Sequence, residues 1–227
     1  GEGFASGNSD SIYRQSTIIR KANPDLVLVL SADHLYTIDF RSVVDTHLTK
    51  RADLTMVTTE VPEDPSRYSV VRTNEVGQVT EFAYKPEEPK GNLVAGEMFL
   101  FSTDVLLSAL DTLQSELGEL GDYGEDLIPY VLEHHRVVEH RHLGYWMDLG
   151  TVQSYWTAQM QLIDGDVATL DERTDGCVHI GSGLAGDAGQ VDGAPPTGEH
   201  PPGGGDRVDL GQRHAGRGPR RPARRCC

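Results

Sequence analysis

The sequence predicts an α/β protein whose first 168 residues form a doubly wound, mostly parallel sheet. Apolar runs of strand length alternate with longer amphipathic segments of helix length, as is typical of strand–helix–strand units. The run from Leu26 to Leu30 is apolar throughout, which indicates a strand buried on both faces. A hydrophobic content of 37% is enough for a sizeable core in one globular domain.

The expected elements follow one another without long gaps. Helices are expected at 9–21, 39–50, 103–117, 125–134 and after Gly150. Strands are expected at 25–31, 53–59, 69–73, 79–82 and 93–101, and the two short ones at 69–73 and 79–82 form a hairpin. In sheets of this kind ligands bind beyond the carboxyl ends of the strands. Polar residues that directly follow a strand are therefore candidates for a site.

The charge argues against one class of function and leaves another open. A formal net charge of −15 argues against a general nucleic-acid binder, because phosphate backbones are held by clustered Lys and Arg. A small anionic ligand needs only a few local cations, backbone N–H groups and a divalent metal. The sequence shows neither an export signal nor an apolar run near the roughly 20 residues that a bilayer requires, so we expect a cytoplasmic protein.

Residues 169–227 differ in composition from the rest. From Asp171 onward the chain holds 13 of its 25 Gly and 6 of its 12 Pro, and it has no Phe, Tyr, Trp or Lys. Such a segment cannot bury a core, and we expect it to be disordered. It resembles out-of-frame translation of a GC-rich gene. A genuine disordered tail, or a basic arm that binds nucleic acid through Arg220 to Arg225, are the alternatives.

Two acids stand where a site is expected. Asp33 comes three residues after the apolar run that ends at Leu30, and Asp148 lies between Tyr145-Trp146-Met147 and a turn that leads into a helix. Each also has a plainer interpretation, since Asp33 could form a turn and Asp148 could cap the helix after it. The residues alone leave both interpretations open.

Five segments, in order, resemble one enzyme family. They are Gly-Asn-Ser-Asp at 7–10, Leu-Ser-Ala-Asp-His-Leu-Tyr at 30–36, Tyr-Lys-Pro-Glu-Glu-Pro at 84–89, Asp-Tyr-Gly-Glu-Asp-Leu-Ile-Pro at 122–129 and Gly-Tyr-Trp-Met-Asp-Leu-Gly-Thr at 144–151. Over residues 1–165 the chain resembles the bacterial glucose-1-phosphate adenylyltransferases, the ADP-glucose pyrophosphorylases of glycogen synthesis. The resemblance implies a Rossmann-like, doubly wound domain of the nucleotide-diphospho-sugar transferase type, here truncated.

The resemblance also implies a reaction and its residues. In that family glucose 1-phosphate attacks the α-phosphorus of ATP and pyrophosphate leaves, a step that depends on charge neutralisation and alignment. Asp33 and Asp148 match the carboxylates that hold Mg²⁺, and Lys85 matches the lysine on the sugar phosphate. The nucleotide side corresponds to Gly7, Asn8, Asp10 and Ala32. Intact members are expected to be homotetramers.

The sugar side departs from the family pattern. Tyr84 stands where the family usually has Glu, Ser69 replaces a Gly before the hairpin's valines, and Ala95-Gly96-Glu97 replaces Ser-Met-Gly. Together with Lys85, we assign Ser69, Tyr84 and Glu97 to the sugar phosphate. Glu97 could supply the carboxylate that position 84 has lost, and hydrogen-bond to sugar hydroxyls.

Two parts of the family pattern have no counterpart in the sequence. These are the N-terminal Gly-rich loop that grips the triphosphate and the C-terminal β-helix with its six-residue apolar period. We therefore expect this chain to be inactive, and unstable because neighbours of the first strand would be unpaired. A sister nucleotidyltransferase with another nucleotide or sugar, and a catalytically dead regulatory homologue, remain as alternatives. DNA upstream of Gly1 and in all frames after Asp171 would test these expectations.

Overall fold

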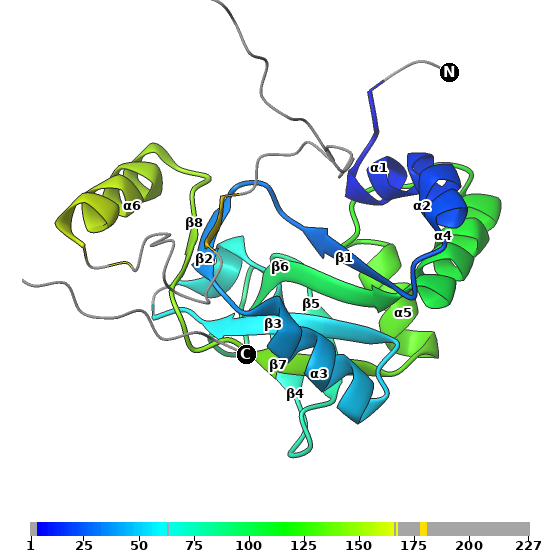
Figure 1. The fold of residues 1–227 in the computed structure, drawn as a ribbon, viewed down its shortest axis with the longest axis horizontal. Helices are drawn as coiled ribbons and strands as arrows, with labels where there is room; N and C mark the ends of the chain where they lie inside the picture. The colour runs from blue at the N-terminus through cyan, green and yellow to red at the C-terminus, as the bar shows by residue number, and fades with distance from the viewer. Residues whose placement is uncertain (1–3, 63, 166, 168–177, 181–227) are drawn as a thin grey trace, which may run out of the picture. The chain divides into compact units, whose positions relative to one another are not determined.

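The computed structural model describes residues 4–62, 64–165, 167 and 178–180 (Figure 1). The helices are α1 (Asn8–Arg14), α2 (Ser16–Ala22), α3 (Phe40–Lys50), α4 (Thr103–Leu117), α5 (Leu127–His134) and α6 (Val152–Asp164), with a 3₁₀ turn at Pro65–Arg67. The strands are β1 (Leu26–Leu30), β2 (His34–Thr37), β3 (Leu54–Glu60), β4 (Val70–Thr73), β5 (Val79–Ala83), β6 (Leu93–Ser102), β7 (Val137–Arg141), β8 (Trp146–Asp148) and β9 (Val178–Ile180).

The larger sheet has six strands, and β6 is its central strand. The order is β5-β4-β6-β3-β7, and β1 also pairs with β6. Because β1 and β3 are both antiparallel to β6, and β7 is parallel to β3, the strands β1, β3 and β7 run in one direction. The α/β class is confirmed. The sheet is mixed, however, because β6 runs against its neighbours and β4–β5 form the antiparallel hairpin that the sequence predicts.

Helices cover both faces of this sheet (Figure 1). Along β6, Phe99 and Phe101 pack with apolar residues of α4 and α5, whereas Met98 and Leu100 pack with residues of α3. Successive side chains of a strand point to opposite faces, so one apolar strand serves two cores. This is why β6 is apolar over most of its length, and why β3 is buried from Leu54 to Thr59, rather than showing alternating burial.

A smaller sheet positions the candidate acids. Its order is β8-β2-β9, and both pairs are antiparallel. The strand β2 follows β1 after a three-residue loop, and β8 lies more than 100 residues further along the chain. The end of β8 is thereby brought beside the loop that follows β1.

The observed elements differ from the expected ones at the first helix and at four strands. The helix expected at 9–21 is two helices, because the chain turns at Gln15 between α1 and α2. The sequence did not predict β2, β7 or β8, which are short. The strand β9 lies within the tail that was expected to be disordered, and it pairs with β2. The other tail residues after 167 lie outside the described residues.

The length and polarity of the described helices are not those of membrane spans. Among the residues that the structure describes, every helix is too short or too polar to cross a bilayer.

A buried histidine should make the fold sensitive to acid. His47 on α3 is 2% exposed, and its ring forms hydrogen bonds with the Thr55 hydroxyl through Nδ1 and with the Ser102 hydroxyl through Nε2. Burial lowers the pKa of His47 below the ordinary 6.5, although the charge of Asp53 partly opposes this shift. Below pH 6.5 the unfolded chain binds a proton that the folded chain takes up only at lower pH, so stability falls as pH falls. We expect the free energy of unfolding to decrease from pH 7 to pH 5 in urea titrations.

The control is a comparison of two histidine variants. His47→Gln should show a weaker decrease than the parent protein, because the proton uptake at this position is gone. His134→Gln, at an exposed position on α5, should keep the parent's pH dependence. Equal slopes for His47→Gln and the parent would contradict the assignment.

Candidate functional site

The structure brings the two candidate acids onto neighbouring segments. Asp33 lies in the loop between β1 and β2, and Asp148 is the last residue of β8. His34 pairs with Asp148 across the small sheet, and the Leu149 N–H donates to the Asp33 carbonyl at 2.8 Å. Two residues that are far apart in the sequence therefore lie side by side at the sheet edge, where the strand pattern predicted a site.

The Asp33 carboxylate is accessible and lies among other potential ligands. Its side chain is 62% exposed, and Oδ1 accepts a hydrogen bond from the Ser31 hydroxyl. The His34 Nε2 atom lies 3.7 Å from the same oxygen. One ligand atom each from Asp33, His34 and Glu97 lie within 4.8 Å of one another. Carboxylate oxygens at this spacing fit a divalent cation such as Mg²⁺, which prefers oxygen ligands.

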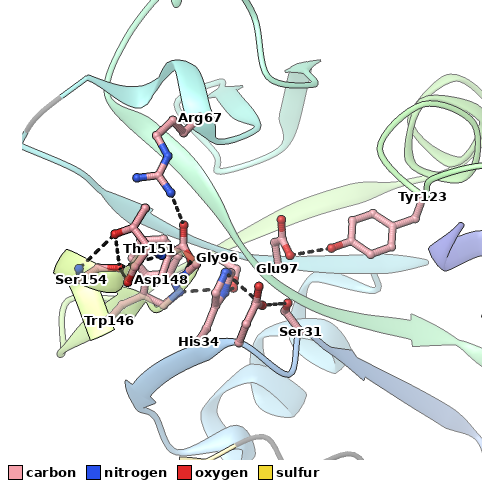
Figure 2. Close-up of polar contacts among 12 residues, drawn as sticks. Ser31, His34, Arg67, Gly96, Glu97, Tyr123, Trp146, Asp148, Thr151 and Ser154 are labelled. Carbon is pink, nitrogen blue, oxygen red and sulfur yellow. Dashed lines mark hydrogen bonds and ion pairs between the residues drawn. The ribbon is translucent and has the colours of Figure 1, made fainter. Parts of the chain in front are cut away.

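The Asp148 carboxylate is already engaged (Figure 2). Its Oδ1 accepts from the Gly150 N–H at 2.6 Å, and its Oδ2 lies 3.4 Å from an Arg67 nitrogen. Only 13% of the side chain is exposed. The interpretation of Asp148 as the cap of the following helix is wrong. The N-cap of α6 is Thr151, which forms a capping box with Ser154. Asp148 instead shapes the turn that precedes the helix.

A third carboxylate, Glu97, joins the acids to the predicted sugar side. Glu97 lies in β6 with a φ of +53°, and its Oε2 accepts from the Tyr123 hydroxyl at 2.7 Å (Figure 2). Burial, and then the nearby Glu97 charge, raise the pKa of Tyr123, which keeps the phenol protonated as a donor. Glu97 was assigned to the sugar side from the sequence, and the structure places it beside Asp33 as well.

Tyr84 and Lys85 lie close enough to Tyr123 and Glu97 to interact with them electrostatically. The Tyr84 hydroxyl donates to Asp122 at 2.7 Å, and the Lys85 ammonium lies 4.9 Å from the centre of the Tyr84 ring. A hydrogen bond with Tyr84 raises the pKa of Lys85, and the charges of Glu97 and Asp122 act in the same direction. Lys85 therefore remains a cation near Glu97, as a phosphate-binding role requires.

Ser69 and Ala32 occupy simpler positions. Ser69 is buried at 5% exposure, and its carbonyl accepts from the Ala95 N–H at 2.9 Å, so it belongs to the junction of β4 and β6. Among the residues that the structure describes, no hydrogen bond joins Ser69 to Lys85 or Glu97. Ala32 is exposed in the loop beside Asp33, where a ligand can approach its backbone.

The segment 7–10 is docked on the segment 121–126. The Ser9 N–H donates to the Gly121 carbonyl at 3.1 Å, and the Ser9 hydroxyl donates to Asp126 at 2.6 Å. Asn8 is exposed, whereas the Asp10 carboxylate is bound internally by Arg14 at 2.9 Å and by the Ser6 N–H at 3.0 Å. The hydrogen bond from Arg14 lowers the pKa of Asp10. Asp10 thus holds the turn together, and Asn8 is the member of this segment whose side chain is open to a ligand.

Gly7 is required by a contact within the protein. A Cβ atom at Gly7 would lie 2.2 Å from the Gly121 carbonyl oxygen, which is backbone and cannot move aside alone. We expect Gly7→Ala to lower the free energy of unfolding by about 2 kcal/mol, because overpacking forces the backbone to shift. Urea unfolding followed by tryptophan fluorescence measures this.

Gly121→Ala is the matched control for Gly7→Ala. The nearest atom to a Cβ at Gly121 would be a Glu125 carboxylate oxygen at 3.6 Å, an ordinary contact, so this change should be tolerated far better. If both variants unfolded at the parent's urea midpoint, the close approach at Gly7 would not constrain the fold.

Several residues of the site have no assigned role in the sequence interpretation. They are His34, Arg67, Tyr123 and Asp126. His34, Tyr123 and Asp126 lie inside the segments 30–36 and 122–129 that resemble the family. Their position in these segments could have marked them as site residues. Arg67 lies in no such segment, and only the fold brings it to Asp148.

The fold and the acid-lined sheet edge are those of an enzyme domain that handles nucleotides, and the chain belongs to the nucleotidyl transferase family. The family's sequence pattern matches residues 2–165. Among curated proteins it is similar to the glucose-1-phosphate adenylyltransferase of Geobacillus stearothermophilus, at 40% identity over 160 residues, which cover 70% of this chain and 41% of that protein. The enzymes of the same name from Lachnospira eligens and Bacillus subtilis are 39% and 36% identical, with 70% of this chain covered in each case and 37% and 43% of the relative. The chain thus spans about two fifths of the length of these relatives.

Proposed function

We propose that this domain serves the transfer of an adenylyl group from ATP to glucose 1-phosphate, giving ADP-glucose and pyrophosphate. The observation that carries the proposal is the placement of Asp33 and Asp148 on adjacent segments at a sheet edge, in a chain of the nucleotidyl transferase family. The names of its relatives support adenylyl and glucose as the transferred group and the acceptor. A role in glycogen or a related α-glucan, a cytoplasmic location and a homotetrameric state belong to the same proposal for the whole protein.

The two acids would act by holding Mg²⁺ against the phosphates. When bound there, the ion neutralises negative charge on the reacting phosphates and helps align them. Asp33 offers an exposed carboxylate for this purpose. Asp148 Oδ2 lies 3.4 Å from the Arg67 guanidinium. For Asp148 to bind the ion, this ion pair with Arg67 must break. Arg67 is then free to pair with a phosphate oxygen, a geometry that guanidinium groups favour.

Lys85 and Glu97 would position the acceptor. Lys85 is a cation held by the Tyr84 ring and hydroxyl, which suits the phosphate of a sugar 1-phosphate. Glu97 carries a carboxylate that Tyr123 holds in place, and a carboxylate accepts hydrogen bonds from sugar hydroxyls. On the opposite side, Asn8, Gly7 and Ala32 would face the base of the nucleotide.

A binding titration tests the proposal on the chain itself. Purified residues 1–227 are titrated calorimetrically with ADP-glucose, UDP-glucose and GDP-mannose in Mg²⁺, and again with EDTA in place of the metal. We expect ADP-glucose to bind most tightly, and only with Mg²⁺. Binding of a different nucleotide sugar in preference would reassign the substrate, and absence of binding by all three would contradict the proposal.

A second assay tests the expectation that this chain is inactive. Pyrophosphate release is measured with residues 1–227, ATP, glucose 1-phosphate and Mg²⁺. We expect none above background, because the sequence contains no Gly-rich loop to hold the triphosphate. Measurable release would show that the loop is dispensable.

A further inference from the structure

Arg67 reaches the candidate site from outside the five segments that resemble the family. It is the last residue of the 3₁₀ turn Pro65–Arg67, which lies between β3 and β4. Its Nη2 atom lies 3.4 Å from Asp148 Oδ2, although the two residues are 81 positions apart in the sequence (Figure 2). A cation is thus placed against one of the two acids to which the proposed function assigns the metal ion.

The backbone of the turn is fixed, whereas the side chain of Arg67 is not enclosed. Asp64 caps the turn and accepts hydrogen bonds from both the N–H and the hydroxyl of Ser66, each at 2.9 Å. The Tyr68 N–H donates to the Pro65 carbonyl at 2.9 Å, and the proline ring restricts φ at the start of the turn. The Arg67 side chain is 53% exposed. Its guanidinium can therefore change partners while the turn stays in place.

The guanidinium borders a hollow that has room for a second anion. This hollow measures about 580 Å³, and its lining includes Arg67, Tyr68, Trp146, Asp148 and the start of α6. The Arg67 guanidinium carbon lies 5.9 Å from the centre of the Tyr68 ring, and the Tyr68 and Trp146 rings meet edge to face at 5.5 Å. Aromatic rings at this distance attract a guanidinium and hold it near the hollow.

The ion pair between Arg67 and Asp148 has the geometry of an exchangeable contact. One nitrogen faces one oxygen at 3.4 Å, whereas strong pairs of this kind are about 2.7–2.9 Å long and often bidentate. The carboxylate itself is held independently, because Asp148 Oδ1 accepts from the Gly150 N–H at 2.6 Å. Departure of the guanidinium would leave Asp148 in place and one of its oxygens free.

We propose that Arg67 binds a phosphate group of the nucleotide sugar, and that its ion pair with Asp148 weakens divalent-ion binding while the site is empty. The proposal rests on the proposed function and adds a residue that couples its two ligands. An ion at Asp148 releases Arg67 for the phosphate, and a phosphate that draws Arg67 away frees Asp148 for the ion. Because such coupling is reciprocal, each ligand should raise the affinity for the other.

Loss of the guanidinium should change the two affinities in opposite directions. In Arg67→Gln, the Mn²⁺ affinity without nucleotide should rise about threefold, since a partly exposed ion pair no longer competes for Asp148. The affinity for ADP-glucose in saturating Mg²⁺ should fall about tenfold, because a charged hydrogen bond to phosphate is lost. General damage to the site would weaken both. Electron paramagnetic resonance of free Mn²⁺ and isothermal titration calorimetry measure the two affinities on residues 1–227.

Two further variants are matched to Arg67→Gln. Arg67→Lys keeps the charge but lacks the planar fork, so Mn²⁺ should bind as in the parent while ADP-glucose binds about threefold more weakly. Arg72 on β4 is 58% exposed and also forms an ion pair 3.4 Å long, with Glu81. Arg72→Gln therefore removes the same charge and a pair of the same length, and both affinities should stay at the parent's values.

The outcomes separate this proposal from the proposed function. If the parent binds ADP-glucose and Arg67→Gln binds it equally well, Arg67 does not contact the phosphate. A fall in both affinities, or an unchanged Mn²⁺ affinity, would overturn the competition at Asp148. Circular dichroism is recorded for each variant, and Arg67→Lys decides the matter if Arg67→Gln unfolds. A parent chain that binds Mn²⁺ but no ADP-glucose would instead contradict the proposed function, and the phosphate contact with it.

Discussion

Asp33→Asn is expected to weaken Mg²⁺-dependent binding of ADP-glucose by about 100-fold or more. Loss of a residue that merely supports a metal ligand typically costs 10–100-fold in metal affinity, and Asp33 is proposed as a ligand itself. The amide keeps the size of the side chain and can still accept from Ser31, but it lacks the negative charge that holds the ion. Isothermal titration calorimetry in Mg²⁺ measures the change.

The control for Asp33→Asn is an acid of similar exposure away from the site. Asp111 on α4 is 52% exposed and pairs with Arg20, so Asp111→Asn should leave ADP-glucose binding unchanged. Thermal melts should show both variants folded, because the Asp33 side chain is largely in solvent. An affinity loss of less than about threefold in Asp33→Asn would remove Asp33 from the proposed metal site.

Asp126→Ala is expected to be the most destabilising of the substitutions discussed. Its Oδ1 accepts from the Ser9 hydroxyl and the Leu127 N–H, each at 2.6 Å, and its Oδ2 accepts from the Gly121 N–H at 2.8 Å. Hydrogen bonds to charged groups contribute about 1.5–3 kcal/mol each, and they are not fully additive. We expect the free energy of unfolding to fall by about 3 kcal/mol in urea titrations.

The same substitution should release the segment that is docked on 121–126. Hydrogen exchange should accelerate more at α1 than at α3, because the Ser9–Asp126 hydrogen bond is one of the contacts that hold α1 against the segment 121–126. Glu125→Ala, at the exposed neighbouring carboxylate, should change neither stability nor exchange. Equal effects of the two substitutions would mean that the Asp126 hydrogen bonds do not anchor this segment.

The sequence predicted long elements well and short or distant pairings poorly. The helix Thr103–Leu117 has the predicted bounds because a long apolar periodicity ends at Gly118, whose φ is +76°. The strand β2 has only four residues, and its partner β8 is over 100 residues away, so no local pattern reveals it. Periodicity also carries no information about strand direction, which is why the antiparallel course of β6 was missed.

The candidate site was predictable where a residue follows a strand or lies in a recognised segment. Asp33 and Asp148 were separate candidates from their positions next to apolar segments, and the family resemblance implied that they act together. The small sheet brings their segments side by side. Two sets of contacts were not predictable, because they depend on side-chain directions that the fold sets. They are the ion pair of Asp148 with Arg67, and the contacts of the Asp10 carboxylate with Arg14 and the Ser6 N–H. The roles proposed for Asp33, Asp148 and Lys85 stay predictions until ligand binding is measured.

The most direct test of the central claim is a crystal structure of residues 1–227 with ADP-glucose and Mn²⁺, with data collected at the manganese absorption edge. The account predicts an anomalous peak about 2.1 Å from an Asp33 carboxylate oxygen, beside the phosphates of the ligand. It also predicts the glucose next to Lys85 and Glu97. A peak away from Asp33, or ADP-glucose bound elsewhere on the domain, would contradict it.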